Sequence, residues 1–427
     1  MRFAEAIRRL DARQPEHMPE PSLDRIRAVA ELLDDPELTY PSIHVTGTNG
    51  KTTAARVAAS VACAHGVTTG LFTSPHLLSV TERFSVCGQD MTEDEFAEEW
   101  EHLEPVLQVV DDRGPLAVTY FEAVTALAYL WFADKPVGLG VFEVGMGGSW
   151  DATNLVDGRI AVITPIGMDH VAELGPTLAD IAGEKAGILK EGATAVLREQ
   201  DPVAAEVVTA RAGEVGCSVR WEGPDWEVEE RLLAVGGQSF RVRGLLATYD
   251  DLYLPLFGDY AVHNAAAGIV AVEALTGQAL HPDTLREGLA AAVVPGRLEV
   301  VGQHPLVILD GAHNPAGAEA LVEAMRESFR WDRLLLVVAV SANKDLAGIA
   351  SALAPLADRV FVTRNDSIRS ADPADAAEAF GGDVERVASV ADAIEAARGA
   401  ATPGDVVLVT GSLFTVADAK RALAAVR

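Results

Sequence analysis

The octapeptide TGTNGKTT, from Thr46 to Thr53, combines a glycine-rich turn with a lysine and several threonines. It follows the apolar run SIHV and precedes the helical stretch AARVAASVACA. In a turn between a strand and a helix, backbone N–H groups and the positive helix end hold phosphate, and a lysine neutralises the charge of its outer groups. The common pattern G-x-x-x-x-G-K-[ST] would need glycine at Val45, so this is a compact variant that begins at Gly47. An ordinary strand–helix turn is the weaker alternative, and we expect a nucleoside triphosphate to bind here.

A hydroxyl, a carboxylate and an imidazole follow or end three other apolar runs. Ser74 follows GLF, Glu143 lies within VFEVGMGG, and His170 follows AVITPIGM. Ligands of parallel sheets bind at the carboxyl ends of the strands, so these side chains are expected beside the phosphate turn. Together they would form a Mg²⁺ site of hard oxygen ligands with one histidine. Taken singly, Ser74 is equally explained as a turn cap and His170 as a loop residue. Glu143 is harder to explain without a cationic partner, because a buried carboxylate is unfavourable.

Lys185 stands in the run AGEKAGILK, among alanines and glycines that add little side-chain bulk. Burial there would favour the neutral amine. The simpler interpretation is a surface helix lysine paired with Glu184. The local sequence leaves both open.

The elements that must position these residues form two alternating series. Apolar strand-like runs and helical stretches alternate from residue 40 to 197, which predicts a mainly parallel sheet covered on both faces. Short β-rich pieces from 226 to 257 predict a small antiparallel sheet. After Pro295-Gly296-Arg297 a second α/β series begins. We therefore predict an α/β protein with an N-terminal P-loop domain, residues 1–298, and a C-terminal Rossmann-like domain, residues 299–427.

Composition narrows the function classes. A chain of 427 residues suggests two or three domains. Its net charge of −29 argues against nucleic-acid binding, and its longest apolar run, 123–132, is too short to span a membrane. Cys63, Cys87 and Cys217 are odd in number and match no C-x-x-C motif, so we expect reduced cysteines in a cytoplasmic protein. Without a dimer signature, a monomer is the default expectation.

Ordered motifs along nearly the whole chain carry a family resemblance. They are TGTNGKTT, TSPHL followed by Glu82-Arg83, EVGMGG-SW-DATN, DH with LGPTLADIAGEKAGI, HNAAAG, PGRLE, LDGAHNP and VTGSLFTV. In this series the chain resembles the folylpolyglutamate synthase/dihydrofolate synthase family of the Mur ligase superfamily. One departure stands out: Ser149-Trp150 replaces the Arg-Leu pair frequent in the family, which puts one anion contact and the shape of the pterin pocket in question.

The resemblance implies an ATP-dependent ligase that adds L-glutamate to the carboxylate of folates, and in some members of dihydropteroate, through an acyl phosphate. The alternative within ligases is a UDP-muramyl-type Mur enzyme, but too few residues precede the P-loop for a UDP-sugar domain. The alternative of another class is a P-loop regulatory NTPase, which would call for a strand ending in aspartate where this chain has Glu143.

The resemblance also implies roles for particular residues. The implied ATP contacts are Thr48, Asn49, Gly50, Lys51, Thr52, Asn264, Arg297 and Asp310. The implied ligands of Mg²⁺, expected as two ions, are Thr52, Ser74, Glu143, His170 and a Lys185 carbamylated by CO₂. The implied catalytic residues are Lys51, Lys185, His170 and His313. The implied pterin or folate contacts are Leu23, His76, Arg83, Thr119, Phe121, Glu122, Trp150, Asp151 and Ala152.

Overall fold

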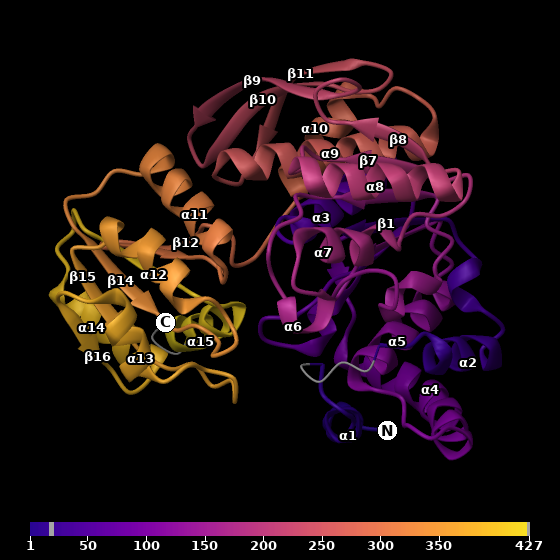
Figure 1. The fold of residues 1–427 in the computed structure, drawn as a ribbon, viewed down its shortest axis with the longest axis horizontal. Coiled ribbons are helices and arrows are strands. Elements are labelled where there is room, and N and C mark those ends of the chain that lie inside the picture. The colour runs from indigo at the N-terminus through magenta and orange to yellow at the C-terminus, as the bar shows by residue number, and fades with distance from the viewer. Residues whose placement is uncertain (17–20, 425–427) are drawn as a thin grey trace. The chain divides into compact units, whose positions relative to one another are not determined.

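The computed structural model describes residues 1–16 and 21–424 (Figure 1). These residues divide into two compact units. The first comprises 1–16, 21–232, 239–254 and 263–292, and the second comprises 233–238, 255–262 and 293–424. The predicted division after residue 298 stays a prediction, and the two units are described separately below.

The first unit contains a mixed sheet with the strand order β4-β3-β2-β5-β1-β6-β7-β8. From β2 to β8 all neighbours are parallel, while β3 pairs antiparallel with both β2 and β4. The strands are β1 (Ser42–Thr46), β2 (Thr69–Phe72), β3 (Phe84–Val86), β4 (Gln89–Asp90), β5 (Leu139–Glu143), β6 (Ile160–Ile163), β7 (Thr194–Leu197) and β8 (Ser218–Trp221). The predicted mainly parallel sheet is confirmed; strands β3, β4 and β8 were not predicted.

Strands β1, β5 and β6 are buried along their whole length, as expected for the centre of a parallel sheet covered on both faces. Their register places Val45 opposite Glu143 on one side and Val162 on the other. The three strands therefore end at one edge of the sheet, where the phosphate turn begins.

Helices cover this sheet. They are α1 (Phe3–Asp11), α2 (Asp24–Leu32), α3 (Lys51–Ala64), α4 (Glu93–Arg113), α5 (Tyr120–Asp134), α6 (Val171–Leu174), α7 (Leu178–Ala186), α8 (Pro202–Val215), α9 (Asp259–Thr276) and α10 (Pro282–Ala291). Short 3₁₀ turns lie at η1 (Pro36–Leu38), η2 (Val80–Arg83) and η3 (Ala152–Leu155). Helix α3 packs on β1, β2 and β5 and on α10, whereas α7 packs on α8 and α4 on α5 (Figure 1).

An aromatic core joins α4 and α5 to the sheet. Phe142 lies 6.2 Å from Phe72 and 5.6 Å from Phe132 between ring centroids. Trp100 of α4 stacks on Phe96 at 6.3 Å. Such ring pairs add packing energy to the burial of large apolar surfaces. This core holds β5, and with it Glu143, against the helical layer.

The predicted small antiparallel sheet is confirmed, with the strand order β11-β10-β9. Its strands are β9 (Glu227–Ala234), β10 (Gly237–Arg243) and β11 (Thr248–Leu254). Strand β10 alternates half-buried and buried residues along most of its length, the pattern of a sheet with one covered face.

The second unit contains a sheet of order β12-β13-β17-β14-β15-β16, in which only the β12–β13 pair is antiparallel among the described residues. Its strands are β12 (Glu299–Gln303), β13 (Leu306–Leu309), β14 (Leu334–Val338), β15 (Arg359–Val362), β16 (Val384–Arg386) and β17 (Val406–Thr410). Its helices are α11 (Pro315–Ser328), α12 (Leu346–Leu353), α13 (Pro373–Phe380), α14 (Val390–Ala400) and α15 (Leu413–Ala424), with the 3₁₀ turn η4 (Ala354–Leu356). The Rossmann-like series was predicted; the antiparallel edge strand β12 was not.

The expectation of reduced cysteines is wrong for one pair. Cys63, in the last turn of α3, forms a disulfide with Cys87, which lies between β3 and β4. The two Cα atoms are 5.5 Å apart, although 24 positions separate the residues in sequence. The pair was missed because no local motif marks it; sheet pairing brings the β3–β4 turn to the end of α3. Cys217 is a buried thiol outside this pair.

Among the described residues, no helix has both the length and the apolar character needed to cross a bilayer.

Candidate active site

The phosphate turn is shaped by two glycines in the left-handed region of backbone space. Gly47 has φ of +143°, and a Cβ there would lie 1.9 Å from Thr164 Oγ1. Gly50, the N-cap of α3, has φ of +92°, and a Cβ there would lie 2.2 Å from Asn264 Nδ2. Both positions therefore require glycine for space as well as for conformation. The close approach of Asn264 brings a residue of α9 to the turn, 214 positions later in the chain than Gly50 (264 − 50 = 214).

Thr48 anchors the turn to the loop that follows β6. Its N–H donates to Pro165 O at 3.0 Å, and its hydroxyl donates to Gly167 O at 3.0 Å. The N–H of Gly167 donates back to the same hydroxyl at 2.9 Å. Three hydrogen bonds thus fix the turn before any ligand binds, which lowers the entropy that ordering it would otherwise require.

Two lysine side chains converge on one carbonyl oxygen of the turn. Lys51 Nζ lies 3.1 Å from Gly47 O, and Lys185 Nζ lies 2.8 Å from the same atom. Two ammonium groups this close repel each other unless an anion lies between them or one of them is neutral. The geometry therefore favours an anion at the turn and a neutral Lys185.

Lys185 is 4% exposed. Burial and, after it, the charge of Lys51 together lower the pKa of its amine to about 7, against the opposite effect of Asp169 and Asp151. The interpretation of Lys185 as a surface residue paired with Glu184 is wrong, because the Glu184 carboxylate contacts the Ser149 hydroxyl instead. Sequence alone could not separate the two, since they differ only in which face of α7 meets the sheet.

Small residues let α7 approach the glycine-rich turn after β5. A Cβ on Gly148 would lie 2.7 Å from Glu184 O, and one on Gly187 would lie 2.4 Å from Ser149 Cβ. The N–H of Ser149 donates to Glu184 O at 2.9 Å. Ser149, one of the two residues that depart from the family pattern, thus helps to fix the helix that carries Lys185.

Glu143 lies at the end of β5 and is 2% exposed. Thr52 Oγ1 donates to its Oε1 at 2.7 Å, and the N–H of Ser74 approaches its Oε2 at 3.4 Å. The ligand oxygens of Thr52 and Glu143 therefore meet at one point, and the backbone of Ser74 adjoins them. This set of carboxylate and hydroxyl oxygens beside a phosphate turn suits Mg²⁺, which binds hard oxygen ligands and keeps water and phosphate in its remaining positions.

His170 follows β6 and begins α6, with a left-handed φ of +51°. Its Nδ1 lies 4.0 Å from Glu173 Oε2, and its N–H donates to Asp169 Oδ1 at 2.8 Å. Asp169 in turn acts electrostatically on Lys185. The turn that carries His170 therefore belongs to the neighbourhood of Lys185.

A buried cationic group lies close to Glu143. Arg83 is 2% exposed, donates through Nε to His76 Nδ1 at 2.9 Å, and forms an ion pair with Glu16. Its guanidinium lies 5.5 Å from the ring centroid of Tyr120. Burial works to lower the pKa of Arg83, but Glu16 and, more weakly, Tyr120 and Glu143 raise it on balance. A hydrogen bond thus links two predicted substrate contacts, His76 and Arg83.

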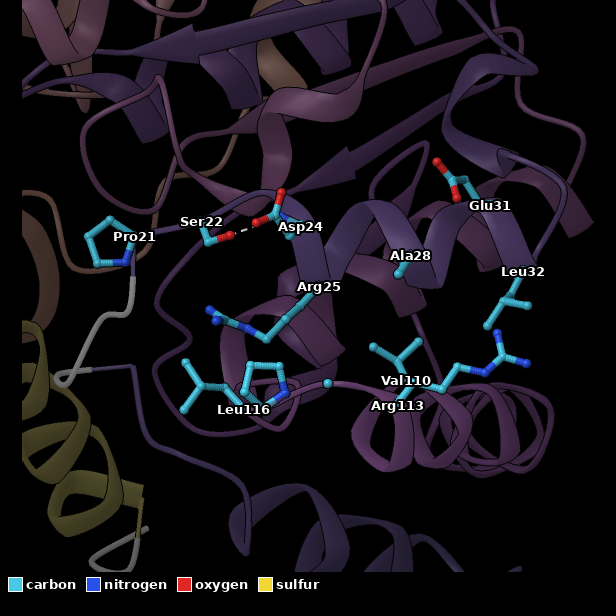
Figure 2. Close-up of a pocket in the computed structure, with 12 residues that line it drawn as sticks. Pro21, Ser22, Asp24, Arg25, Ala28, Glu31, Leu32, Val110, Arg113 and Leu116 are labelled. Atoms are coloured by element: carbon cyan, nitrogen blue, oxygen red, sulfur yellow. Dashed lines mark hydrogen bonds between the residues drawn. The ribbon is translucent and has the colours of Figure 1, made fainter.

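The predicted pterin residues at the start of α5 form a helix cap. The N–H of Thr119 donates to Glu122 Oε2 at 2.8 Å, and the N–H of Glu122 donates to Thr119 Oγ1 at 3.2 Å. Arg25 Nε, on α2, lies 3.0 and 2.9 Å from the two oxygens of Glu122. Arg25 also lines a pocket of 890 Å³ between α2 and the segment 113–116, seen in Figure 2. Arg25 was not among the predicted site residues.

The remaining predicted pterin residues differ in exposure. Asp151 is buried and accepts from the N–H groups of Met146 at 2.9 Å and Thr153 at 3.0 Å, so its carboxylate organises its own loop. Trp150 is half-buried and packs near Gly147. Ala152 is buried. The ring centroid of Phe121 lies 6.1 Å from that of Phe72. Leu23 is partly buried and packs on the aromatic core.

A charged network that the sequence did not reveal holds Asn264. Arg198 Nη1 donates to Asn264 Oδ1, and Arg198 Nε donates to Glu222 Oε2 at 2.7 Å. His263 also contacts Glu222. Burial works to raise the pKa of Glu222, but the hydrogen bonds from His263 and Arg198 outweigh it and lower the pKa to about 2. No short motif marks Arg198 or Glu222, because the network joins three elements.

The predicted ATP contacts of the second unit surround the end of β13. Asp310 is 3% exposed and accepts from the N–H groups of Leu298 at 2.9 Å and Ala312 at 2.8 Å. Burial raises the pKa of Asp310, and Arg297 works against that rise. His313 Nδ1 lies 2.9 Å from Gly311 O, and a Cβ on Gly311 would lie 2.3 Å from Arg297 Nη1. Arg297, Asp310 and His313 therefore form one group within this unit.

Comparison with known proteins defines the class. The Mur ligase middle domain matches residues 45–272, and the Mur ligase glutamate ligase domain matches residues 296–413. Together with the compact phosphate turn and the two converging lysines, these matches define an ATP-dependent ligase of the Mur type.

Similarity to individual relatives shows to which family of Mur-type ligases the chain belongs. The chain is 41% identical to the dihydrofolate synthase/folylpolyglutamate synthase of Mycobacterium tuberculosis, over 96% of this chain and 92% of the relative. It is 33% identical to the Bacillus subtilis enzyme of the same name, over 94% and 95%. The solved M. tuberculosis folylpolyglutamate synthase complexed with ADP superposes with a TM-score of 0.95 at 39% identity, covering 99% and 98% of the two chains. The chain belongs to the dihydrofolate synthase/folylpolyglutamate synthase family of Mur ligases.

Proposed function

We propose that this chain ligates L-glutamate to the carboxylate of folates, with ATP converted to ADP and phosphate. The observation that carries the proposal is the meeting of Lys51 and Lys185 on Gly47 O beside the Thr52–Glu143 pair. That arrangement suits an anion that gains charge during phosphoryl transfer. Family relatives named for this activity support the acceptor and the amino acid.

The reaction needs an activated carboxylate, because a carboxylate does not condense with an amine in water. A carboxylate oxygen of the folate attacks the γ-phosphorus, the bond to the β-phosphate oxygen breaks, and ADP leaves. The amino nitrogen of glutamate then attacks the acyl carbon, the carbon–oxygen bond to phosphate breaks, and the amine loses a proton. The product is an amide with free phosphate.

Each part of the turn has a task in the first step. N–H groups of the turn and the start of α3 hold the phosphates, and Lys51 neutralises charge on the transferred group. Thr52, Ser74, Glu143 and His170 would hold Mg²⁺, which supplies positive charge to the phosphoryl oxygens when bound. Two ions are proposed because the family resemblance implies them.

Lys185 is proposed to carry a carbamate. A neutral amine attacks CO₂ to give an N-carboxylate and one proton, and a pKa near 7 provides the neutral form at physiological pH. The product places a negative charge beside Lys51, where two ammonium groups would otherwise repel. Its oxygens would add ligands to the Mg²⁺ group.

The substrate contacts are proposed from the family resemblance, and the hydrogen bond that joins His76 to Arg83 supports them. His76 and Arg83 are proposed to contact the folate, together with Leu23, Thr119, Phe121, Glu122, Trp150, Asp151 and Ala152. Asn264 is proposed to meet the adenine, and Arg297 and Asp310 the rest of the nucleotide. His313 is proposed to act near the transferred phosphate.

One assay tests the function and its alternatives. The protein is incubated with Mg-ATP and glutamate and, in turn, with tetrahydrofolate, dihydropteroate or UDP-muramyl-L-alanine. We expect ADP release that depends on folate, and product with dihydropteroate would add the synthase activity named in several relatives. Turnover with the UDP-muramyl precursor alone, or ADP release that needs no acceptor, would overturn the proposal in favour of a cell-wall ligase or a regulatory NTPase.

A further inference from the structure

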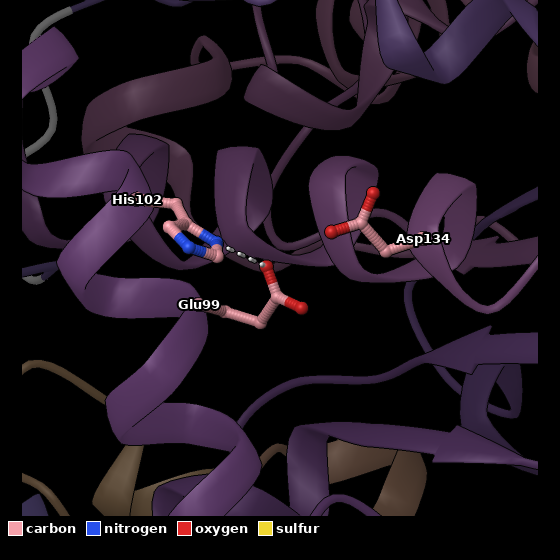
Figure 3. A group of neighbouring side chains, drawn as sticks. All are labelled: Glu99, His102 and Asp134. Atoms are coloured by element: carbon pink, nitrogen blue, oxygen red, sulfur yellow. Dashed lines mark ion pairs between the residues drawn. The ribbon is translucent and has the colours of Figure 1, made fainter.

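Helices α4 and α5 carry a group of metal-ligating side chains away from the residues assigned to the ligase reaction. Glu99 and His102 lie on α4 three positions apart, and Asp134 lies at the end of α5 (Figure 3). One ligand atom from each residue lies within 4.8 Å of the other two. Residues three apart on a helix share a face, so Glu99 and His102 can bind one ion together.

Glu99 has an environment that a solvated surface carboxylate would not have. It is 7% exposed and sits beside the stripe of Phe96, Trp100 and Leu103 that packs into the aromatic core. Its Oε2 is fully buried and has no hydrogen-bond partner among the described residues. An unpaired buried carboxylate oxygen is strongly unfavourable unless a cation or a proton neutralises it.

The neighbouring protein cations do not supply that neutralisation. His102 Nδ1 lies 3.9 Å from Glu99 Oε2, beyond hydrogen-bond distance. Lys135 Nζ lies 2.6 Å from Glu95 Oε1, so its charge is directed to another carboxylate. Burial and, after it, the charges of Asp134 and Glu98 raise the pKa of Glu99 to about 7, while His102 and Lys135 work against that rise. Among the described residues, no cationic group therefore lies within hydrogen-bond distance of Glu99 Oε2.

We propose that Glu99, His102 and Asp134 bind a first-row divalent cation such as Zn²⁺, which joins α4 to α5. One imidazole nitrogen and two carboxylate oxygens match the preferences of Zn²⁺, with water completing the coordination. Mg²⁺ prefers oxygen ligands alone, so this site differs in chemistry from the one beside Glu143. His102 and Asp134 are exposed, so their side chains can rotate to shorten the present spacing to bonding distances.

Zn²⁺ binding by the full chain tests the proposal. Chelator-treated protein is titrated with Zn²⁺ in excess Mg²⁺, which occupies the oxygen site beside the phosphate turn. The variants are Glu99→Gln, His102→Ala and Asp134→Asn. The matched control is Glu98→Gln, which removes a carboxylate from the adjacent, exposed position of the same helix. We expect wild type and control to bind one more Zn²⁺ than the variants, whose affinity falls about tenfold or more.

Two further measurements separate a metal site from a structural role of Glu99. Zn²⁺ should raise the melting temperature of wild type and Glu98→Gln but not of the His102→Ala and Asp134→Asn proteins, whose exposed substitutions leave the core intact. Binding near pH 7 should also release a proton, because the bound carboxyl must be ionised. Equal Zn²⁺ stoichiometry and equal thermal shifts in all five proteins would refute the site.

Discussion

Lys51 and Lys185 donate to the same acceptor, the carbonyl oxygen of Gly47, at 3.1 and 2.8 Å. One lysine begins helix α3 and the other lies near the end of α7, so amine groups reach the turn between them from two sides. This placement explains the lowered pKa of the buried Lys185, and it locates where the triphosphate should gain its strongest contacts.

Removal of the Lys185 amine should abolish most of the activity. We expect Lys185→Ala to lower kcat on the order of 100-fold, because a group close to the transferred phosphoryl is lost. Formate or acetate should restore part of the rate by replacing the carbamate. The control is Lys190→Ala, which removes a half-buried lysine that donates to the backbone carbonyls of Asn154 and Val156. Added carboxylates should not raise the activity of that control; equal rescue of both variants would contradict the carbamate.

The stability of the protein should depend on pH through Lys185. The pKa is about 7 in the folded protein and about 10.4 in the unfolded chain. Between these two pH values the unfolded chain binds more protons than the folded protein, so the contribution of Lys185 to the free energy of unfolding rises with pH. Below pH 7 the ammonium is buried on folding, and its full unfavourable contribution remains. The free energy of unfolding of wild type and of Lys185→Met is measured with urea in CO₂-free buffer at several pH values. We expect the two free energies to approach each other from pH 7 to 10. A difference that does not change with pH would show that folding does not lower the pKa of Lys185, and hence that its ammonium form is not buried.

The turn should not tolerate a side chain at Gly50. We expect Gly50→Ala to weaken ATP binding at least tenfold, because the new Cβ would displace the Asn264 amide as well as strain the backbone. Gly66→Ala is the control, since Gly66 has φ of +82° but open space around it. That control should lose only the strain energy of about 1–2 kcal/mol in stability. Isothermal titration with a non-hydrolysable ATP analogue and urea unfolding separate the two effects.

Glu143 should set the Mg²⁺ requirement. Glu143→Gln keeps the size of the side chain but removes the charge, so we expect kcat to fall on the order of 100-fold and the Mg²⁺ concentration for half-maximal activity to rise. The exposed Glu206 provides a matched Glu→Gln control on α8. An unchanged Mg²⁺ dependence in Glu143→Gln would remove this residue from the metal ligands.

Arg198 should act as a positioning residue for Asn264. A lysine in Arg198→Lys can still form an ion pair with Glu222. It lacks the forked guanidinium of arginine, whose second nitrogen donates to Asn264. We expect KM for ATP to rise roughly three- to tenfold with little change in kcat, because the mispositioned amide affects nucleotide binding in the ground state. Thermal unfolding reports whether the network has collapsed. A fall in kcat with unchanged KM would argue for a different role.

Much of the site was predictable because its parts are local. The phosphate turn needs glycines with unusual φ, a lysine and a flanking strand and helix, all within one short segment. Strand ends after β5 and β6 were visible as apolar runs that stop at a polar residue. The small antiparallel sheet and the second α/β series were visible from their periodicity for the same reason.

Other features depended on which distant segments pack together. The disulfide joins Cys63 to Cys87 without a local motif, and Arg198 reaches Asn264 across 66 positions. The strand order and the antiparallel pairing of β3, β4 and β12 depend on contacts between distant segments, which periodicity within one segment does not encode.

The sequence by itself determined a phosphate turn, the order of the α/β elements and the family resemblance, because these reside in residue types at short spacing. Only the tertiary structure decided that Lys185 is buried rather than exposed and that it meets Gly47, 138 positions away. The physical reason is that burial and charge proximity set the protonation of a lysine, and both arise when α7 packs against the turn after β5. Packing of α4 against α5 likewise buries Glu99 Oε2 with no hydrogen-bond partner among the described residues.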